Sequence, residues 1–187
     1  VNGERTRQTT VEEDYYYAQY LEDTAAQGAT DYTGEPIELD IAGGTLSPQG
    51  NFIKDDIRSN SNESRRALVW NTDDLESVQW TVEVAQSGYY NIEVDYLSIT
   101  GSTTAPQRDI LIDGEEACKE MNVYSFPRVW EDDGEVWVNQ LGDEVRPRQK
   151  EVIEWQTTRL NDSQGKYAEP LRYYLTAGTH TITMVYV

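Results

Sequence analysis

Histidine and cysteine are almost absent from this sequence, which has one of each among its 187 residues. The lone thiol, Cys118, cannot form an internal disulfide, and a structural role is favoured over a nucleophilic one because no His/Cys cluster lies beside it. The lone histidine, His180, is in phase with Ile182 and Met184 in an alternating apolar pattern, which favours a packed or rim position. Serine-triad chemistry and a histidine-based zinc site are therefore poorly supported, and no phosphate-loop, dinucleotide-binding or calcium-hand motif occurs.

Positive charge is also scarce. The chain has 15 basic residues, four of them lysines, against 34 acidic ones, so its net charge is −19. This balance argues against nucleic acid and against anionic membrane surfaces as partners. The sequence also lacks a signal peptide and any apolar run of membrane-spanning length, so no direct membrane insertion is expected. It opens at "VNGERTRQ" and stops inside the alternating pattern "HTITMVYV", which we interpret as a trimmed or processed fragment.

The first part of the chain predicts an arm followed by a helix. Residues 1–9 are typical of a disordered arm, and residues 10–27 predict a helix that Thr10 caps while Glu13 reaches back. Gly28 ends this helix. One stripe of the helix carries Val11, Tyr15, Ala18, Leu21 and Ala25, and we expect it to pack on a neighbouring surface.

Residues 32–187 change to a period of two, which is typical of half-buried strands. Alternating patterns occur at residues 37–41, 78–84, 90–96 and 180–186, and residues 108–112 predict another short strand. Several short strands separated by turn signals predict an all-β sandwich. The two clearest strands, 78–84 and 89–97, are joined by the short turn "AQSG" and predict a hairpin. Asp113 and Gly114 predict a tight turn after residues 108–112.

Residues 115–150 predict a long irregular connection, which is uncommon in a compact sandwich unless it has a function. Large aromatic side chains lie on or beside this segment, and they include three of the five tryptophans of the chain. A ring can stack on a sugar face, while arginine, carboxylate and amide groups meet its hydroxyls. We therefore predict a carbohydrate site here, formed by Tyr124, Trp130, Trp137, Asp143, Arg146, Arg148 and Trp155, with Arg128 and Asn139 interleaved among them.

Two alternatives remain open for these residues. The tryptophans would equally serve to cover the end of the sandwich. Arg146 and Arg148, which flank a proline, would equally brace the loop against carboxylates such as Asp132, Asp133 or Glu144. A two-carboxylate glycosidase is a further alternative, although any pair of carboxylates carries little weight in so acidic a chain.

The segment "IELDIA" offers one metal-binding pattern. Glu38 and Asp40 would lie on the outward face of the strand predicted at 37–41. Two carboxylates at this spacing could share a calcium ion, which prefers oxygen ligands. Outward acidic residues on a strand are also ordinary.

Three segments resemble carbohydrate-binding modules of the family six and family thirty-five type: "VQWTVEVAQSGYYNIEVDYL", "RDILIDGEE" and "YYLTAGTHTITMVYV". A second likeness comes from "FPRVW", "GDEVRPRQ", Trp155, "LNDSQGKYAEPLRYYL" and "AGTHTI" in this order. It is similar to the domain that precedes the body of certain extracellular solute-binding lipoproteins of bacterial sugar transporters. The helix "YYYAQYLEDT" fits the start of that arrangement.

The resemblance implies a galactose-binding-like jelly roll with a short N-terminal helix, possessing a final strand beyond Val187. It implies an extracellular location, tethered to the cell surface as part of a lipoprotein, and a structural calcium held at Glu38 and Asp40. The expected function is non-catalytic capture of an oligosaccharide or a cell-wall or plant glycan, next to the rest of a solute-binding protein. The alternative is a structural or interdomain β-sandwich without its own ligand, and a glycoside hydrolase is the third hypothesis.

Overall fold

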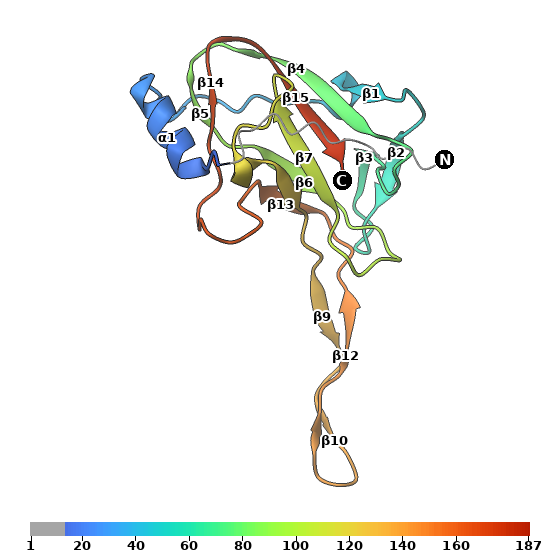
Figure 1. Cartoon of the computed structure of the whole chain (residues 1–187). Coiled ribbons are helices and arrows are strands. Elements are labelled where there is room, and N and C mark those ends of the chain that lie inside the picture. Colours follow the sequence, from blue (N-terminus) through green and yellow to red (C-terminus); the bar gives the residue numbers. More distant parts are fainter. Residues whose placement is uncertain (1–13) are drawn as a thin grey trace, which may run out of the picture.

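The computed structural model describes residues 14–187, which form a mostly β body with one short α-helix and a long projecting hairpin (Figure 1). The helical elements are α1 (Tyr17–Ala26) and the 3-10 turns η1 (Ile41–Gly43) and η2 (Lys119–Met121). The strands are β1 (Thr45–Ser47), β2 (Ile53–Arg58), β3 (Ser64–Leu68), β4 (Ser77–Val84), β5 (Gly88–Tyr90), β6 (Glu93–Tyr96), β7 (Gln107–Ile112), β8 (Val123–Ser125), β9 (Trp130–Asp133), β10 (Trp137–Val138), β11 (Glu144–Val145), β12 (Arg148–Glu151), β13 (Gln156–Arg159), β14 (Tyr173–Leu175) and β15 (Gly178–Tyr186). The prediction of an all-β chain with an N-terminal helix is therefore confirmed at this level.

The largest sheet has five strands in the order β1-β4-β15-β7-β8, and all of its neighbours are antiparallel. Strand β4 shows why the sequence pattern predicted it. Val78, Val82 and Val84 are buried, while Gln79, Thr81 and Glu83 between them are exposed. This alternation places one face of the strand on the core and the other toward solvent.

Three two-stranded pairs complete the body: β2–β3, β6–β13 and β5–β14. Side chains of β14 and β5 share one core with side chains of the five-stranded sheet. Tyr173 and Leu175 come from β14, while Val82 and Ile182 come from the large sheet. Burial of such apolar area contributes roughly 25 cal/mol per Å² and holds the layers together.

The predicted hairpin between residues 78–84 and 89–97 is wrong. Strand β4 pairs with β1 and β15, whereas β5 pairs with β14 and β6 pairs with β13. The segment "AQSG" therefore carries the chain from the large sheet to a strand pair on the other side of the core. A four-residue connection fits either role, because its length does not specify which strand becomes the partner.

Helix α1 spans a shorter range than predicted and uses a different face. Its inward side chains are Tyr17, Tyr20, Leu21 and Thr24, whereas Ala18 and Ala25 are exposed. Tyr17, the first residue of the helix, donates its backbone N–H to the carboxylate of Glu120 at 2.8 Å, which satisfies one of the unpaired donors at the helix start. The disordered segment predicted at residues 1–9 lies outside the described residues, and so do Thr10, Val11 and Glu13 of the predicted helix.

The Asp-Gly turn after β7 forms as predicted. Asp113 and Gly114 have φ values of +53° and +84°, and Ile112 forms an antiparallel bridge with Glu115. A two-residue connection of this kind requires positive φ at both central positions, which asparagine, aspartate and glycine tolerate best. The turn also brings the Asp113 carboxylate to the neighbouring strand β15.

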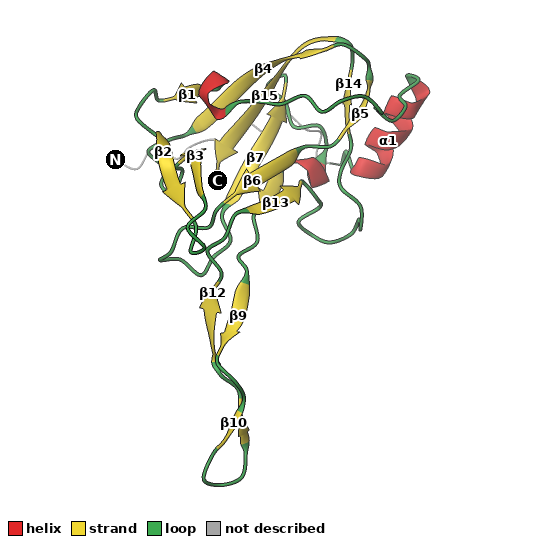
Figure 2. Ribbon diagram, turned by 180° about the vertical axis from the view of Figure 1, so that it is seen from behind, coloured by secondary structure: helices red, strands yellow, loops and turns green. Residues whose placement is uncertain are grey.

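Residues 129–152, which we call the arm, are not an irregular loop. They form a hairpin that projects away from the body (Figures 1 and 2). Its stem is the pair β9–β12, and its outer part is the pair β10–β11. The prediction of an irregular connection at 115–150 is therefore wrong for most of its length.

Candidate functional site

The base of the arm is fixed by a buried ion pair. The guanidinium of Arg128 lies 2.6 Å from the carboxylate of Glu151, and only 8% and 10% of the two side chains are exposed. Arg128 also donates to the carbonyl oxygens of Thr104 and Ile99, each at 2.9 Å. These contacts connect both strands of the stem to the body, so they define the direction in which the arm leaves it.

Two features interrupt and close the arm. The strand ladders stop between Asp133 and Trp137, where Gly134 has a φ of +117° and faces Pro147 on the opposite strand. The end of the arm turns at residues 139–143. There the side-chain oxygen of Asn139 accepts hydrogen bonds from the backbone N–H groups of Leu141 and Asp143, both at 2.9 Å. This turn forms the outer end of the arm, so a molecule that approaches the arm end-on contacts it first.

The arm does not bring its predicted ligand residues together. Trp130 is on the stem and Trp137 on the outer pair, and seven residues of extended chain span about 23 Å. Asp143 belongs to the end turn, where its carboxylate accepts a hydrogen bond from the Asn139 amide at 3.1 Å. A single sugar ring therefore cannot contact both tryptophans.

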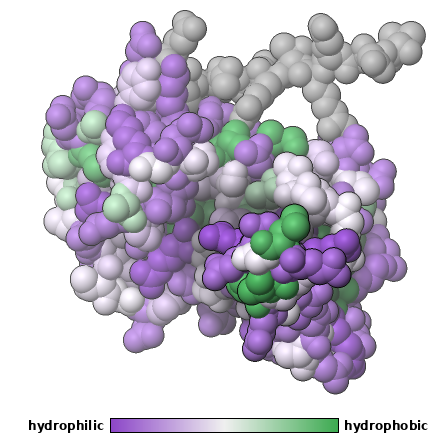
Figure 3. Space-filling view, turned by 90° about the horizontal axis from the view of Figure 1, so that it is seen from below, coloured by the Kyte–Doolittle hydropathy of each residue, from purple (hydrophilic) through white to green (hydrophobic). Residues whose placement is uncertain are grey.

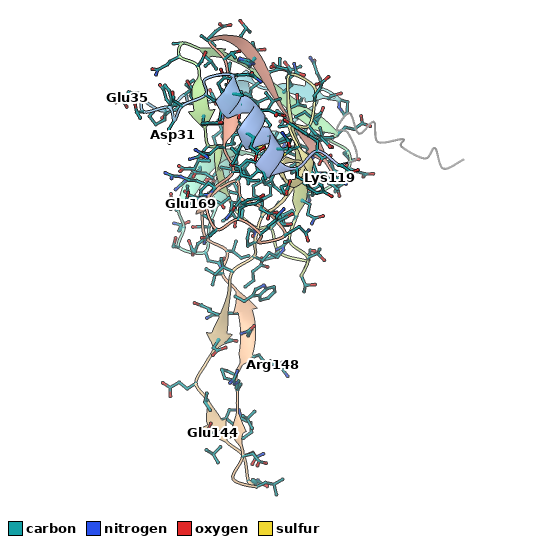
Figure 4. All side chains as sticks on the ribbon, turned by 60° about the vertical axis from the view of Figure 1, so that its left-hand side comes forward. Asp31, Glu35, Lys119, Glu144, Arg148 and Glu169 are labelled. Atoms are coloured by element: carbon teal, nitrogen blue, oxygen red, sulfur yellow. The ribbon has the colours of Figure 1, made fainter. Side chains whose placement is uncertain are left out.

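The two predicted arginines also have a different setting. Figure 4 shows Arg148 on the stem of the arm and Glu144 nearer its end. Among residues 14–187, no ion pair joins Arg146 or Arg148 to a carboxylate, although Arg148 faces Asp133 in the strand register. The bracing role belongs instead to Lys150, whose ammonium lies 3.3 Å from Glu131 and 3.5 Å from Asp133.

Trp155 and Tyr124 belong to the body. The indole of Trp155 donates to the carbonyl of Glu63 at 3.1 Å and carries the Arg65 guanidinium 5.0 Å from its ring centre. Tyr124 is 1% exposed, and its hydroxyl lies 2.6 Å from that of Tyr173. Burial raises the pKa of both phenols. The prediction that Tyr124 contacts a ligand is therefore corrected, because it is a core residue with no accessible ring face.

The predicted calcium ligands lie in an irregular segment, since residues 37–40 form no strand. Asp40 caps η1 by accepting from the backbone N–H of Ala42 at 3.1 Å, and its carbonyl accepts from the Trp80 indole at 2.9 Å. Both Glu38 and Asp40 are exposed. Within residues 14–187, no group of three or more metal-binding side chains occurs, so this part of the chain gives the two carboxylates no third protein ligand of those types.

A polar groove of about 520 Å³ lies on the body, far along the chain from the predicted site. It is lined by Asp31, Tyr32, Tyr89, Asn91, Arg159, Glu169, Pro170 and Arg172. Figure 4 shows two of its carboxylates, Asp31 and Glu169, on the same side of the body.

Four segments meet at this groove. The residues after α1 run beside β5, where Asp31 bridges to Tyr89 and Tyr32 donates its backbone N–H to the Tyr89 carbonyl at 3.1 Å. This close approach depends on Gly88, because a Cβ there would lie 2.9 Å from the carbonyl oxygen of Thr30. The end of β13 supplies Arg159, and the segment leading into β14 supplies Glu169 and Arg172.

Charged contacts hold the floor of the groove in place. The Arg172 guanidinium lies 3.0 Å from Asp31 and 4.7 Å from the centre of the Tyr89 ring. Partial burial alone would lower the pKa of Arg172, but the neighbouring Tyr17 and Asp31 outweigh it and raise that pKa. Tyr32 stacks on Tyr90 with ring centres 4.3 Å apart. Arginine and both tyrosines are therefore positioned before any ligand arrives.

Two side chains of the groove are unengaged. Within the described residues, neither the amide of Asn91 nor the carboxylate of Glu169 has a hydrogen-bond partner. The Asn91 amide adds a donor and an acceptor for a polar ligand, and the Glu169 carboxylate adds acceptors, beside the pre-positioned guanidinium. Sequence reasoning missed this groove because its residues come from four separate stretches with no characteristic spacing. The one signal was the density of tyrosine and arginine in "DYTG" and "PLRYY".

The one histidine and the one cysteine of the sequence do not line the groove. His180 lies 2.7 Å from both the Asp113 carboxylate and the Thr176 carbonyl, one at each ring nitrogen. Because both partners are acceptors, they favour the doubly protonated ring. Cys118 is fully buried, and burial raises the pKa of its thiol to about 12. Both residues therefore have structural positions in the body.

No protein-family model matches the chain, and the searches of curated proteins and of solved structures likewise found no match. In the described part of the chain, no helix has the length and apolar character needed to cross a bilayer.

Proposed function

We propose that this chain is a non-catalytic carbohydrate-binding domain with a jelly-roll connectivity, and that its ligand lies in the polar groove. The observation that carries the proposal is the set of fixed and free polar groups around one cavity. Arg172 and Arg159 are oriented by carboxylates, while Asn91 and Glu169 are unengaged among the described residues. Sugar hydroxyls act as both donors and acceptors, so they complement such a mixture of side chains.

The aromatic part of the groove supports the same ligand class. Tyr32 and Tyr89 line the cavity beside these polar groups. Carbohydrate rings have apolar C–H faces as well as hydroxyl edges, and the partly exposed ring of Tyr32 offers an apolar surface to such a face. Tyr89 is only 8% exposed and has Arg172 over its ring, so it supports the groove from below. Because the tyrosines and Arg172 are already held by their neighbours, less ordering is required when a ligand binds.

We assign no catalytic role to His180 and Cys118, the usual candidates for base and nucleophile. His180 is engaged at both ring nitrogens, and the Cys118 thiol is buried with a raised pKa. Asp31, the second carboxylate of the groove, is paired with Arg172. We further propose that the domain belongs to an extracellular, surface-tethered sugar-capturing protein, as the sequence resemblance implies.

A glycan array followed by isothermal titration tests this function on the full chain. We expect millimolar or tighter binding of at least one oligosaccharide. Replacement of either unengaged groove residue, Asn91→Ala or Glu169→Ala, should weaken it about tenfold, because each removes a hydrogen bond to the ligand. These two variants should fold normally, since both side chains are exposed and neither makes a hydrogen bond or ion pair within the described residues. Repeating the titration with calcium and with a chelator tests the predicted ion at Glu38 and Asp40.

Two results would overturn the assignment in different ways. If no oligosaccharide binds at millimolar concentration, carbohydrate is not the ligand. If binding is lost in Trp137→Ala and unchanged in the groove variants, the ligand lies on the arm, as the sequence predicted. Release of a shortened sugar during the titration, lost in Glu169→Gln, would show a glycosidase instead.

A further inference from the structure

The end of the arm is the most apolar exposed surface that the structure describes. Six of the eleven most exposed large hydrophobic side chains among residues 14–187 lie on the arm, and four of them are within residues 136–141. We call residues 135–144 the arm tip. Its exposed fractions are 53% for Val136, 57% for Trp137, 63% for Val138 and 87% for Leu141. Figure 3 looks along the arm from below and shows apolar atoms gathered at this end.

The tip does not bury these side chains against the rest of the described chain. Strands β10 and β11 pair with each other alone, and they form a sheet separate from the body. Trp137 and Val145 are directly opposite in this ladder, whereas Val138 and Glu144 are the next pair and point to the other face. The apolar residues therefore surround the end of a narrow two-stranded element and contribute little to its own folding.

Carboxylates surround this apolar end. Glu135, Asp143 and Glu144 belong to the tip, and no cation pairs with any of them in the part of the chain that the structure describes. Positive charge on the arm is confined to the strand that leads back to the body, at Arg146, Arg148 and Lys150. A surface that receives the tip must therefore offer apolar area in the middle and positive charge at its edge.

We propose that the arm tip is a docking element for another protein, which receives Trp137 and Leu141 in an apolar pocket bordered by lysine or arginine. A hairpin end is narrow, so it fits a concave pocket better than a flat surface. Tryptophan is the residue type most often found at the energetic centre of protein interfaces, and a polar rim excludes water around it. The Arg128–Glu151 pair connects the stem of the arm to the body, so the tip is held away from the body surface.

Charge also disfavours two other binding partners for the tip, a second copy of this chain and an anionic bilayer. A second copy of this chain carries a net charge of −19, so two copies repel each other and offer few cations for the rim. An anionic bilayer surface repels the three carboxylates of the tip for the same reason. The proposal concerns a surface distinct from the polar groove, so it stands or falls independently of carbohydrate binding.

Site-specific photo-crosslinking in the cells that produce the protein identifies the partner. The crosslinking amino acid p-benzoylphenylalanine replaces Leu141 at the tip, and a control chain carries it in place of Ile99, an exposed residue of the body. We expect a protein crosslinked at position 141 and absent from the position 99 control. The crosslinked peptide should belong to an apolar pocket with lysine or arginine at its edge.

The affinity of the purified partner for the full chain then tests the chemistry. Trp137→Ala should weaken binding by at least about 30-fold, as expected for an interface centre. Glu135→Lys with Glu144→Lys should weaken it and reduce its dependence on salt. The matched control Ile99→Ser should leave affinity unchanged, and all variants should keep the wild-type circular dichroism spectrum.

Four results would overturn the proposal. They are crosslinks to a second copy of this chain, crosslinks to lipid with flotation on phosphatidylcholine vesicles, no product above the position 99 control, and charge reversal that strengthens binding. The first would assign the tip to self-association, the second to membrane insertion, and the third would leave it without a partner in those cells. The fourth would contradict a positively charged rim.

Discussion

The hydroxyl of Tyr20 lies 2.7 Å from the backbone nitrogen of Tyr174, so a side chain of α1 pairs with the outer edge of β14. Tyr17 does the same with the backbone N–H of Arg172 at 2.9 Å. The two tyrosines are one helical turn apart, and the two N–H groups are two residues apart, one directly before β14 and one within it. The helix therefore completes the hydrogen bonding of an edge strand that lacks a second neighbour.

Loss of these hydroxyls should destabilise the fold measurably. Tyr17→Phe and Tyr20→Phe should each lower the free energy of unfolding by about 1 kcal/mol, because each removes one hydrogen bond without creating a large cavity. Urea denaturation followed by circular dichroism measures the change. Tyr16→Phe is the matched control, since Tyr16 is 42% exposed. Equal losses in all three variants would contradict a specific role at the strand edge.

The His180–Asp113 pair should make stability depend on pH in a defined window. Burial alone would lower the pKa of His180, but the hydrogen bonds to Asp113 and the Thr176 carbonyl raise it above its usual value of 6.5. The stabilisation is complete below 6.5 and is lost as pH rises through the raised pKa. Burial would raise the pKa of Asp113, but His180 and the Thr181 N–H lower it below 3.8. That stabilisation is present above 3.8 and is lost as pH falls through the lowered pKa.

Unfolding experiments across pH check this window. Asp113→Asn should remove at most about 1 kcal/mol between pH 4 and 6.5, since half of the carboxylate side chain is exposed and solvent screens the pair. The difference between wild type and variant should shrink at higher pH as His180 loses its proton. A difference that is constant from pH 4 to 9 would show that the ion pair contributes nothing.

The Arg128–Glu151 pair should be the most sensitive contact of the arm. Glu151→Ala leaves a buried guanidinium without its carboxylate, and breaking a buried pair in this way costs about 3 kcal/mol or more. Thermal unfolding measures the loss. Glu131→Ala removes an exposed partner of Lys150 and should change stability by less than about 1 kcal/mol. Similar losses in both variants would contradict the importance of burial.

Gly88 should be indispensable to the groove. In Gly88→Ala the new methyl group would lie 2.9 Å from the carbonyl oxygen of Thr30 and 3.2 Å from the backbone nitrogen of Tyr32. Both are backbone atoms, so the segment bearing Asp31 and Tyr32 must move, at a cost of about 1–3 kcal/mol. The control Gly43→Ala has no atom within 4 Å and should change stability by less than about 0.5 kcal/mol. Unchanged stability in Gly88→Ala would disprove this packing.

The sequence predicted elements best where one face is buried. Val78, Val82 and Val84 alternate with exposed residues, and this pattern is visible without a structure. The partner of that strand was not predictable, because alternation specifies a face and not a neighbour. The turn at Asp113 and Gly114 was predictable, since its positive φ values restrict the residue types.

The arm and the groove were harder to predict from the sequence, for two different reasons. Both faces of the arm at Trp137 and Val138 are exposed, so no hydrophobic alternation marks its strands. The groove is assembled by tertiary contacts between distant segments, such as Asp31 and Arg172, which are 141 residues apart. Tyr124 was misassigned because position beside a loop does not reveal burial.

The stem of the arm also bears on solubility. A two-stranded ribbon has two open edges, on which another chain could add as a third strand and begin an aggregate. Charged side chains at successive positions of the stem, among them Glu131, Asp133, Arg148 and Lys150, oppose such growth. In the outer pair β10–β11, Glu144 is the one charged strand residue, so charge opposes strand addition more strongly along the stem than at the end of the hairpin.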